Sequence, residues 1–220
     1  MDRTLTVTGQ AKLSVAPDTI ELTMDLQSKH EVYEKAMKLS AEATEALRSA
    51  FDKAGFDGKA LKTTNFNISP NYESYQDKKT GSYRSRFVGY CVYHSVKIAF
   101  PAKNDLLGKA FAAVAESRVN PQFSINYTVK DTESVKNELI KKAVEDSRVK
   151  AEILTAAAGV RLGLIASINY SWSSIELISN RMRMNAEPMM MAAKCSAPEM
   201  SVEPEDIDVS DTVTVVWYIG

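Results

Sequence analysis

Apolar and polar residues alternate along several stretches of this chain, a pattern typical of strands that bury one face. The longest stretch is 87–100, FVGYCVYHSVKIAF, where every second position from Val88 to Phe100 is apolar or aromatic except for His94. We expect it to be a central strand on which the helices before and after it pack. Alternation also occurs at 5–15, 20–26, 61–69, 123–129, 162–172 and 212–219.

Between these strands, apolar residues recur at the spacing of a helix. This spacing covers 32–54, 106–114 and 135–158, and Gly55 and Gly159 stand where the first and last of these helices should end. The first two strands, 5–15 and 20–26, flank Ala16-Pro17-Asp18, and we predict that they form an antiparallel hairpin. The order β-β-α-β-β-α-β-α-β-β predicts one α+β domain over 1–220, with a mostly antiparallel or mixed sheet and helices packed on one face.

Two segments show no sustained period, and we expect both to be long loops. The segment 70–86 is polar and contains several tyrosines, whereas 175–205 is rich in methionine, proline and alanine. We expect the second loop to be partly disordered.

The composition narrows the class of protein. With 220 residues, 45% of them hydrophobic and 25% charged, the chain has enough apolar side chains for a soluble globular core. The net charge is -1, and Lys and Arg form no basic patch, which argues against nucleic-acid binding. No apolar run is long enough for a transmembrane segment, and the chain as written shows no signal peptide, so we expect a cytoplasmic protein. The alternative is the periplasm or envelope, if a signal peptide has been removed.

Four stretches carry a resemblance to a known family. They are Thr8-Gly9 with Ala16-Pro17-Asp18, then 63–72, then Val88-Gly89-Tyr90, and last 143–163, AVEDSRVKAEILTAAAGVRLG. In this order and spacing the chain resembles the SIMPL-domain family, a largely uncharacterised group of bacterial envelope proteins with a mammalian signalling relative that associates with a kinase. The sequence departs from that family in having Glu205-Asp206 where a Pro-Gly turn is usual.

The resemblance implies an α+β fold and offers no catalytic residues. Some relatives assemble into large rings, and others are linked to oxidative stress or to a signalling kinase, so the resemblance implies a homo-oligomer or a protein partner. The chain also contains no phosphate-binding loop, nucleophile elbow or HExxH motif. We therefore predict a non-enzymatic protein without a cofactor.

His94 is the residue of the central strand that a purely apolar face does not explain. A general base or a metal ligand needs a carboxylate, His or Cys partner, and none is adjacent in sequence. The favoured interpretation is a buried histidine bonded to a neighbour. The alternative is an enzyme or ligand-binding protein with a pocket between sheet and helices near His94 and Tyr90.

Two further groups of residues suggest binding. Soft sulfur ligands favour Cu(I), so the Met-rich loop is a second alternative site, although such segments more often provide adaptable apolar cover. Its candidate ligands are Met182, Met184, Met189, Met190, Met191 and Cys195. Tyrosines interleaved with arginines are typical of interfaces. The candidate interface residues are Tyr72, Tyr75, Tyr83, Arg84 and Arg86.

The preferred hypothesis is a self-associating interaction or structural module that uses exposed strand edges and the two long loops.

Overall fold

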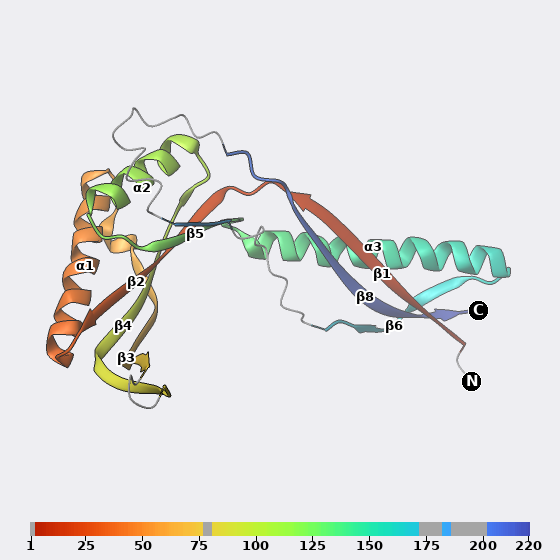
Figure 1. Cartoon of the computed structure of the whole chain (residues 1–220). Coiled ribbons are helices and arrows are strands. Elements are labelled where there is room, and N and C mark those ends of the chain that lie inside the picture. The colour runs from red at the N-terminus through yellow and green to blue at the C-terminus, as the bar shows by residue number, and fades with distance from the viewer. Residues whose placement is uncertain (1–2, 77–80, 172–181, 186–201) are drawn as a thin grey trace. The chain divides into compact units, whose positions relative to one another are not determined.

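The computed structural model describes residues 3–76, 81–171, 182–185 and 202–220. Helices and antiparallel sheets make up the described part (Figure 1), which confirms the α+β class. The order matches the predicted one apart from an added short strand, β7, and a 3₁₀ turn, η1. The elements are β1 (Thr4–Val15), β2 (Thr19–His30), α1 (Tyr33–Lys53), η1 (Gly58–Ala60), β3 (Lys62–Gln76), β4 (Tyr83–Pro101), α2 (Asn104–Glu116), β5 (Gln122–Thr128), α3 (Thr132–Ala158), β6 (Leu162–Asn169), β7 (Met182–Asn185) and β8 (Ile207–Ile219).

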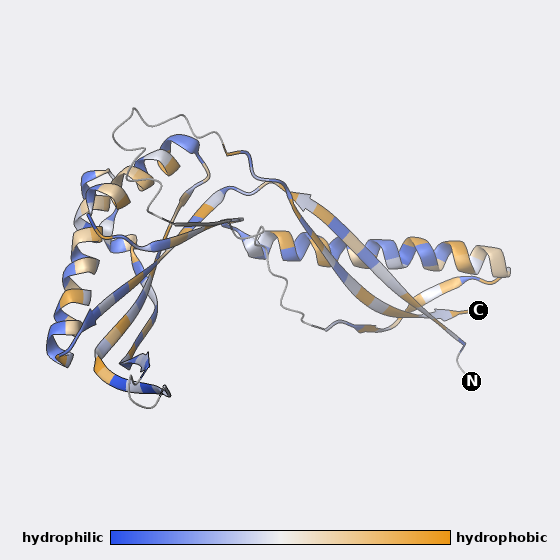
Figure 2. Cartoon of the chain, viewed as in Figure 1, coloured by the Kyte–Doolittle hydropathy of each residue, from blue (hydrophilic) through white to orange (hydrophobic). Residues whose placement is uncertain are grey.

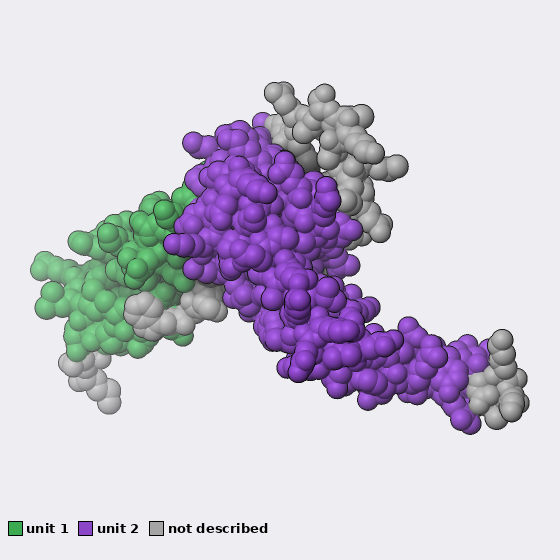
Figure 3. Space-filling view, turned by 90° about the vertical axis from the view of Figure 1, so that its left-hand side faces the viewer, with its two compact units in different colours: residues 1–18, 128–179, 204–220 green, residues 19–127, 180–203 purple. Residues whose placement is uncertain are grey.

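The chain divides into two compact units, each with its own sheet (Figure 3). Unit 1 comprises residues 1–18, 128–179 and 204–220, and unit 2 comprises 19–127 and 180–203. The predicted hairpin between the first two strands is wrong, because β1 pairs with β8 and β2 pairs with β4. Asp18 shows why: its backbone N–H donates to the Thr128 carbonyl, and its carboxylate accepts from the Lys130 N–H. The link between β1 and β2 is thus bonded to the end of β5 and to the segment that follows it, instead of closing a turn. That all 220 residues act as one domain stays a prediction.

Unit 2 is a five-stranded sheet in the order β3-β4-β2-β5-β7, covered by α1 and α2. The strand expected to be central, β4, lies inside the sheet between β3 and β2, and its predicted apolar face is buried from Val92 to Phe100. The helices bring their apolar sides to this face (Figure 2). Side chains that fill this core include Leu22, Met24, Leu47, Phe51, Ile98, Leu107 and Ile125.

Unit 1 is a three-stranded sheet in the order β1-β8-β6, with α3 packed on β1 and β8. The buried residues of α3 recur every fourth position, and most of them are small, so the helix axis lies close to the sheet. They are Leu139, Ala143, Ser147, Ala151 and Thr155. The helix begins with Asp131, whose carboxylate accepts from the Ser134 N–H, and it ends at Gly159, which has a φ of 70°.

The segment 70–86 is not the long loop that its polarity suggested. β3 continues to Gln76 and β4 begins at Tyr83, and the two strands pair as far as Gln76 opposite Tyr83. Cross-strand contacts explain this extension, because Tyr72 packs on Phe87 and Glu73 forms an ion pair with Arg86 at 3.3 Å. We call the paired residues 70–76 and 83–89 the arm. Figure 3 shows it as a narrow extension of unit 2.

The second expected loop, 175–205, contains β7, which pairs with β5. Residues 175–181 and 186–201 lie outside the described residues, so the disorder expected for this segment stays a prediction.

Candidate functional site

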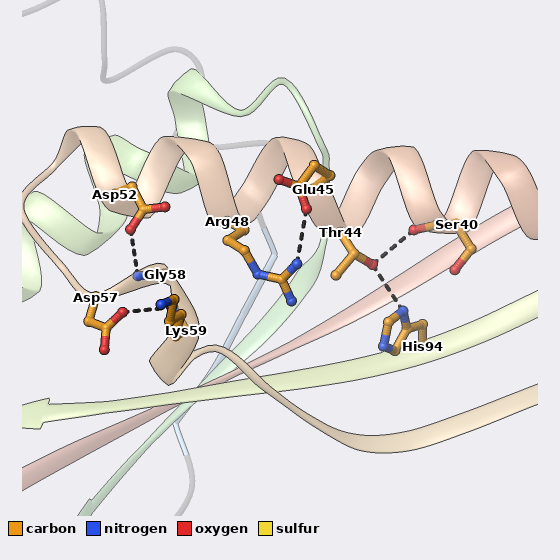
Figure 4. Close-up of polar contacts among 9 residues, drawn as sticks. All are labelled: Ser40, Thr44, Glu45, Arg48, Asp52, Asp57, Gly58, Lys59 and His94. Atoms are coloured by element: carbon orange, nitrogen blue, oxygen red, sulfur yellow. Dashed lines mark hydrogen bonds and ion pairs between the residues drawn. The ribbon is translucent and has the colours of Figure 1, made fainter.

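His94 lies on the buried face of β4 and connects three elements of unit 2 (Figure 4). Only 9% of its surface is exposed. Its Nδ1 atom lies 3.0 Å from the Thr44 hydroxyl of α1, and its Nε2 atom lies 2.8 Å from the Thr63 hydroxyl of β3. The ring also packs edge-on against Phe66 at a centroid distance of 5.1 Å. Both ring nitrogens are therefore bonded.

The hydrogen bonds assign the tautomer of this histidine. The Thr44 hydroxyl donates its single proton to the Ser40 carbonyl at 2.8 Å, so it accepts from Nδ1–H of His94. In the neutral ring Nε2 is then the acceptor, and the Thr63 hydroxyl donates to it. Burial lowers the pKa of His94 below its ordinary value of 6.5, and no charged group faces the ring among these contacts.

Tyr90, the other residue of the hypothetical pocket, contacts different rings. It packs edge-on against Tyr33 at 5.4 Å and against Phe87 at 5.4 Å. A hollow of about 490 Å³ does occur at the start of α3 in unit 1, where Asp131, Glu133 and Lys141 are among its lining residues. It contains neither His94 nor Tyr90, and a pocket beside those two residues stays a prediction.

Aromatic rings form a continuous series along one face of the arm. Tyr33 contacts Tyr90, Tyr90 contacts Phe87, and Phe87 contacts Tyr72 at 5.7 Å, with each pair of rings nearly perpendicular. The register of the two strands places Tyr83, four pairs beyond Phe87, on the same face. We call Tyr33, Tyr72, Tyr83, Phe87 and Tyr90 the aromatic ladder. It continues the core face of the sheet past Tyr33, the first residue of α1, and beyond that residue no described helix of unit 2 covers it.

The opposite face of the arm is charged. Arg86 forms an ion pair with Glu73 and lies over the Tyr75 ring at 6.0 Å, and Arg84 is the cross-strand neighbour of Tyr75. The candidate interface residues therefore divide between two faces. Tyr72 and Tyr83 belong to the ladder, whereas Tyr75, Arg84 and Arg86 lie on the charged face.

The candidate sulfur ligands lie mostly outside the described residues. Met189, Met190, Met191 and Cys195 are not described, and Met182 and Met184 are placed only as backbone positions of β7. Cys91 is a buried free thiol. Copper binding stays a prediction.

Two glycines in the stretches that carry the family resemblance make close backbone contacts. Gly89 has a φ of 130°, and a Cβ atom there would lie 2.6 Å from Glu31 Cα. Gly9 of β1 faces α3, where a Cβ atom would lie 2.6 Å from the Ser147 nitrogen. Glycine is required at both places because another backbone occupies the space of a side chain.

The Gly9 contact is reinforced by hydrogen bonds at the outer edge of β1. The Asp146 carboxylate accepts from the Gln10 N–H at 2.7 Å, and Lys150 donates to the Thr8 carbonyl at 3.5 Å. Lys150 also pairs with Asp146 at 2.7 Å. The bonds from Lys150 and from Gln10 hold the pKa of Asp146 below its ordinary value.

Sequence reasoning did not single out Tyr33, Phe87 or β6 as functional. Tyr33 looks like an ordinary first-turn residue of a helix, and Phe87 looks like the first residue of a buried strand. The signal for the ladder was the aromatic residues Tyr83 and Phe87, which lie on one face of β4 with Ser85 between them.

Comparison with known proteins shows the family to which the chain belongs. Residues 5–217 match the model of the SIMPL family, described as a protein of unknown function (DUF541), and the chain belongs to this family. It is 29% identical to a 26 kDa periplasmic immunogenic protein of Brucella melitensis over 165 residues, which are 75% of this chain and 65% of that protein. The corresponding protein of Brucella abortus is 28% identical over the same shares. The uncharacterized protein YggE of Edwardsiella ictaluri is 23% identical over 96% of this chain and 85% of that protein.

The chain therefore spans less than two thirds of the length of the two Brucella relatives. These relatives are named periplasmic, which contradicts the expectation of a cytoplasmic protein. That expectation rested on the first residues of the chain as written, and these do not determine the compartment. In the described part, no helix combines the length and the apolar character needed to cross a membrane.

Proposed function

We propose that this protein is a non-enzymatic interaction module that self-associates through the aromatic ladder of the arm. The observation that carries the proposal is that the ladder continues a core face past Tyr33, where no helix of the described residues covers it. Tyr72 is 58% exposed and Tyr83 78% exposed, although both lie on the side of the sheet that is buried farther along. Large exposed apolar patches of this kind mark interaction sites.

The area of the ladder suits a contact between two copies. An aromatic side chain buries about 150–250 Å² when it is fully covered, so each half-exposed ring leaves about 100 Å² open. The four exposed rings leave about 450 Å² open per copy, because Tyr33, Tyr72, Tyr83 and Phe87 are 47%, 58%, 78% and 49% exposed. A reciprocal contact between two arms then covers about 900 Å² in total, the size of a weak, reversible interface. An arm that met an unlike surface would need an equally large apolar patch on that partner.

The ring geometry also favours a specific contact over a loose one. Successive rings meet edge to face, which is a preferred geometry of aromatic pairs, and rings from a second ladder can contact them in the same way. The paired strands and the Glu73–Arg86 ion pair hold the rings in place before binding, which lowers the entropy lost on association.

We also propose that the protein acts in the periplasm, supported by the names of the two Brucella relatives. A role in stress tolerance is a prediction that rests on the family resemblance alone.

Light scattering on a sizing column tests the function. The double variant Tyr72→Ser, Phe87→Ser should lower the mass relative to the wild type, because it removes the middle of the ladder. The matched control is Tyr93→Ser, which removes a half-exposed tyrosine from the other face of β4. The proposal is overturned if the double variant, folded by circular dichroism, keeps the mass of the wild type.

A further inference from the structure

The two outer edges of the unit 1 sheet differ in how their backbone groups are bonded. At the edge of β1, side chains of α3 occupy the backbone groups: Asp146 accepts from Gln10 and Lys150 donates to Thr8. At the other edge lies β6, and no described residue pairs with its outer side. An unpaired edge presents a row of N–H and C=O groups that can template another strand.

β6 is firmly held on its inner side. Before the strand, the Arg161 N–H donates to the Gly220 carbonyl at 2.6 Å, and the Gly220 N–H donates back at 3.1 Å. After the strand, the Tyr170 hydroxyl donates to the Asp211 carboxylate at 2.7 Å, which raises the pKa of Tyr170 to about 12. The strand is therefore anchored on its inner side at both ends, and it is extended without an outer partner among the described residues.

The side chains of β6 lack the usual protection of an edge. Its sequence, LGLIASIN, contains no charged residue and no proline. Ile165 and Ile168 lie opposite Trp217 and Val215 of β8, and so they share the core face of the sheet. Yet they are 42% and 50% exposed, because α3 packs on β1 and β8. Leu164, which lies within a register shift, is 82% exposed.

We propose that β6 pairs antiparallel with β6 of a second copy, which joins two unit 1 sheets into one. This inference rests on the proposed self-association and adds a second contact to it, on the other unit. The occupant must be an extended strand because the unused groups are backbone donors and acceptors. It must be uncharged and apolar because it lies beside Ile165 and Ile168. A second β6 meets both conditions, and in a two-fold arrangement the exposed isoleucines of the two copies become neighbours across the new pair.

Two separate contacts, one through the arm and one through β6, build an assembly larger than a dimer. When one of the two contacts is lost, the other still holds two copies together as a dimer, and the loss of both leaves a monomer. Light scattering on four proteins distinguishes the contacts: the wild type, the arm variant Tyr72→Ser, Phe87→Ser, the β6 variant Ile168→Lys, and the combination. The matched control is Ile153→Lys, which places the same charge at an exposed isoleucine of α3 in the same unit.

The expected masses are a dimer for the arm variant, a dimer for Ile168→Lys and a monomer for the combination, with Ile153→Lys equal to the wild type. An arm variant that is already monomeric overturns the β6 contact and leaves the proposed function standing. An arm variant with the wild-type mass overturns the proposed function, and the effect of Ile168→Lys then decides the β6 contact alone.

Hydrogen exchange on the wild type gives a second measurement that needs no variant. Amides of 162–169 should exchange several-fold more slowly at high than at low protein concentration, while those of β1 should not change. Equal exchange of β6 amides at concentrations where the mass doubles overturns the pairing.

Discussion

Gly9→Ala is the sharpest test of how β1 and α3 fit together in unit 1. The added Cβ atom would lie 2.6 Å from the Ser147 nitrogen, 2.9 Å from Ser147 Cβ and closer still to the Ala143 carbonyl oxygen. Carbon atoms pack at about 3.5–4.0 Å, so α3 must retreat by about 1 Å. The retreat stretches the bond of 2.7 Å between Gln10 and Asp146 past the length of a hydrogen bond.

Two effects add to the free energy lost. Overpacking of a well-packed site costs about 1–3 kcal/mol. The lost bond to a carboxylate costs about 1.5 kcal/mol, the lower end of its range because the site is partly exposed. We expect Gly9→Ala to destabilise unit 1 by about 3 kcal/mol, which for a chain of this size lowers the melting temperature by about 6–12 °C.

Urea unfolding followed by Trp217 fluorescence measures this effect, because Trp217 is buried in unit 1 and Trp172→Phe removes the other tryptophan. The control is Gly108→Ala, a helical glycine whose added Cβ meets nothing within 4 Å. It should stabilise unit 2 by about 0.5–1 kcal/mol. A Gly9→Ala protein within about 0.5 kcal/mol of the wild type, the range of an ordinary surface substitution, would refute the close packing of β1 on α3.

Three further substitutions test other contacts. His94→Asn should cost about 1–3 kcal/mol at pH 7.5, because it breaks the bonds to the two threonine hydroxyls. Since the folded pKa of His94 is lowered, the wild type loses stability as pH drops below 6.5 toward that pKa, and the difference in unfolding free energy between wild type and variant should narrow. A difference that stays constant in denaturant titrations from pH 7.5 to 5 would contradict the burial of His94. Asp146→Asn should cost less than about 1 kcal/mol at pH 7, because the ion pair is partly exposed. That cost should vanish as pH falls through the lowered pKa of Asp146, and urea midpoints at pH 7 and 2.5 that differ from wild type equally would argue against it. Gly89→Ala should lower the thermal midpoint of unit 2 because of both its φ and the nearby Glu31 backbone, and an unchanged midpoint in calorimetry would count against that packing.

The elements that could be predicted from the sequence are those whose signals are local. The buried face of β4 follows from period-two alternation over 88–100, and the end of α3 follows from Gly159. Strand pairing was less accessible, because β1 pairs with β8 about two hundred residues later. A short link with a proline looks like a hairpin turn until the bonds of Asp18 to the distant Thr128 and Lys130 are known.

The arm shows how composition misleads. Polar residues and tyrosines over 70–86 are typical of a solvated loop, but tyrosines also stabilise strands by cross-strand contacts. Because a two-stranded arm buries neither face, its sequence lacks the alternation of apolar and polar residues that would indicate strands. For His94, the sequence predicted burial and a bonded neighbour. The partners Thr44 and Thr63 lie 50 and 31 residues away, and only the fold brings their hydroxyls to the ring.

The central claim is that this chain self-associates, and sedimentation equilibrium on the unmodified protein tests it most directly. Because the ladder and β6 are exposed apolar surfaces, we predict a weight-average mass that rises with concentration across the micromolar range and exceeds twice the 24.3 kDa of one chain. A mass of 24.3 kDa at every concentration would contradict the account.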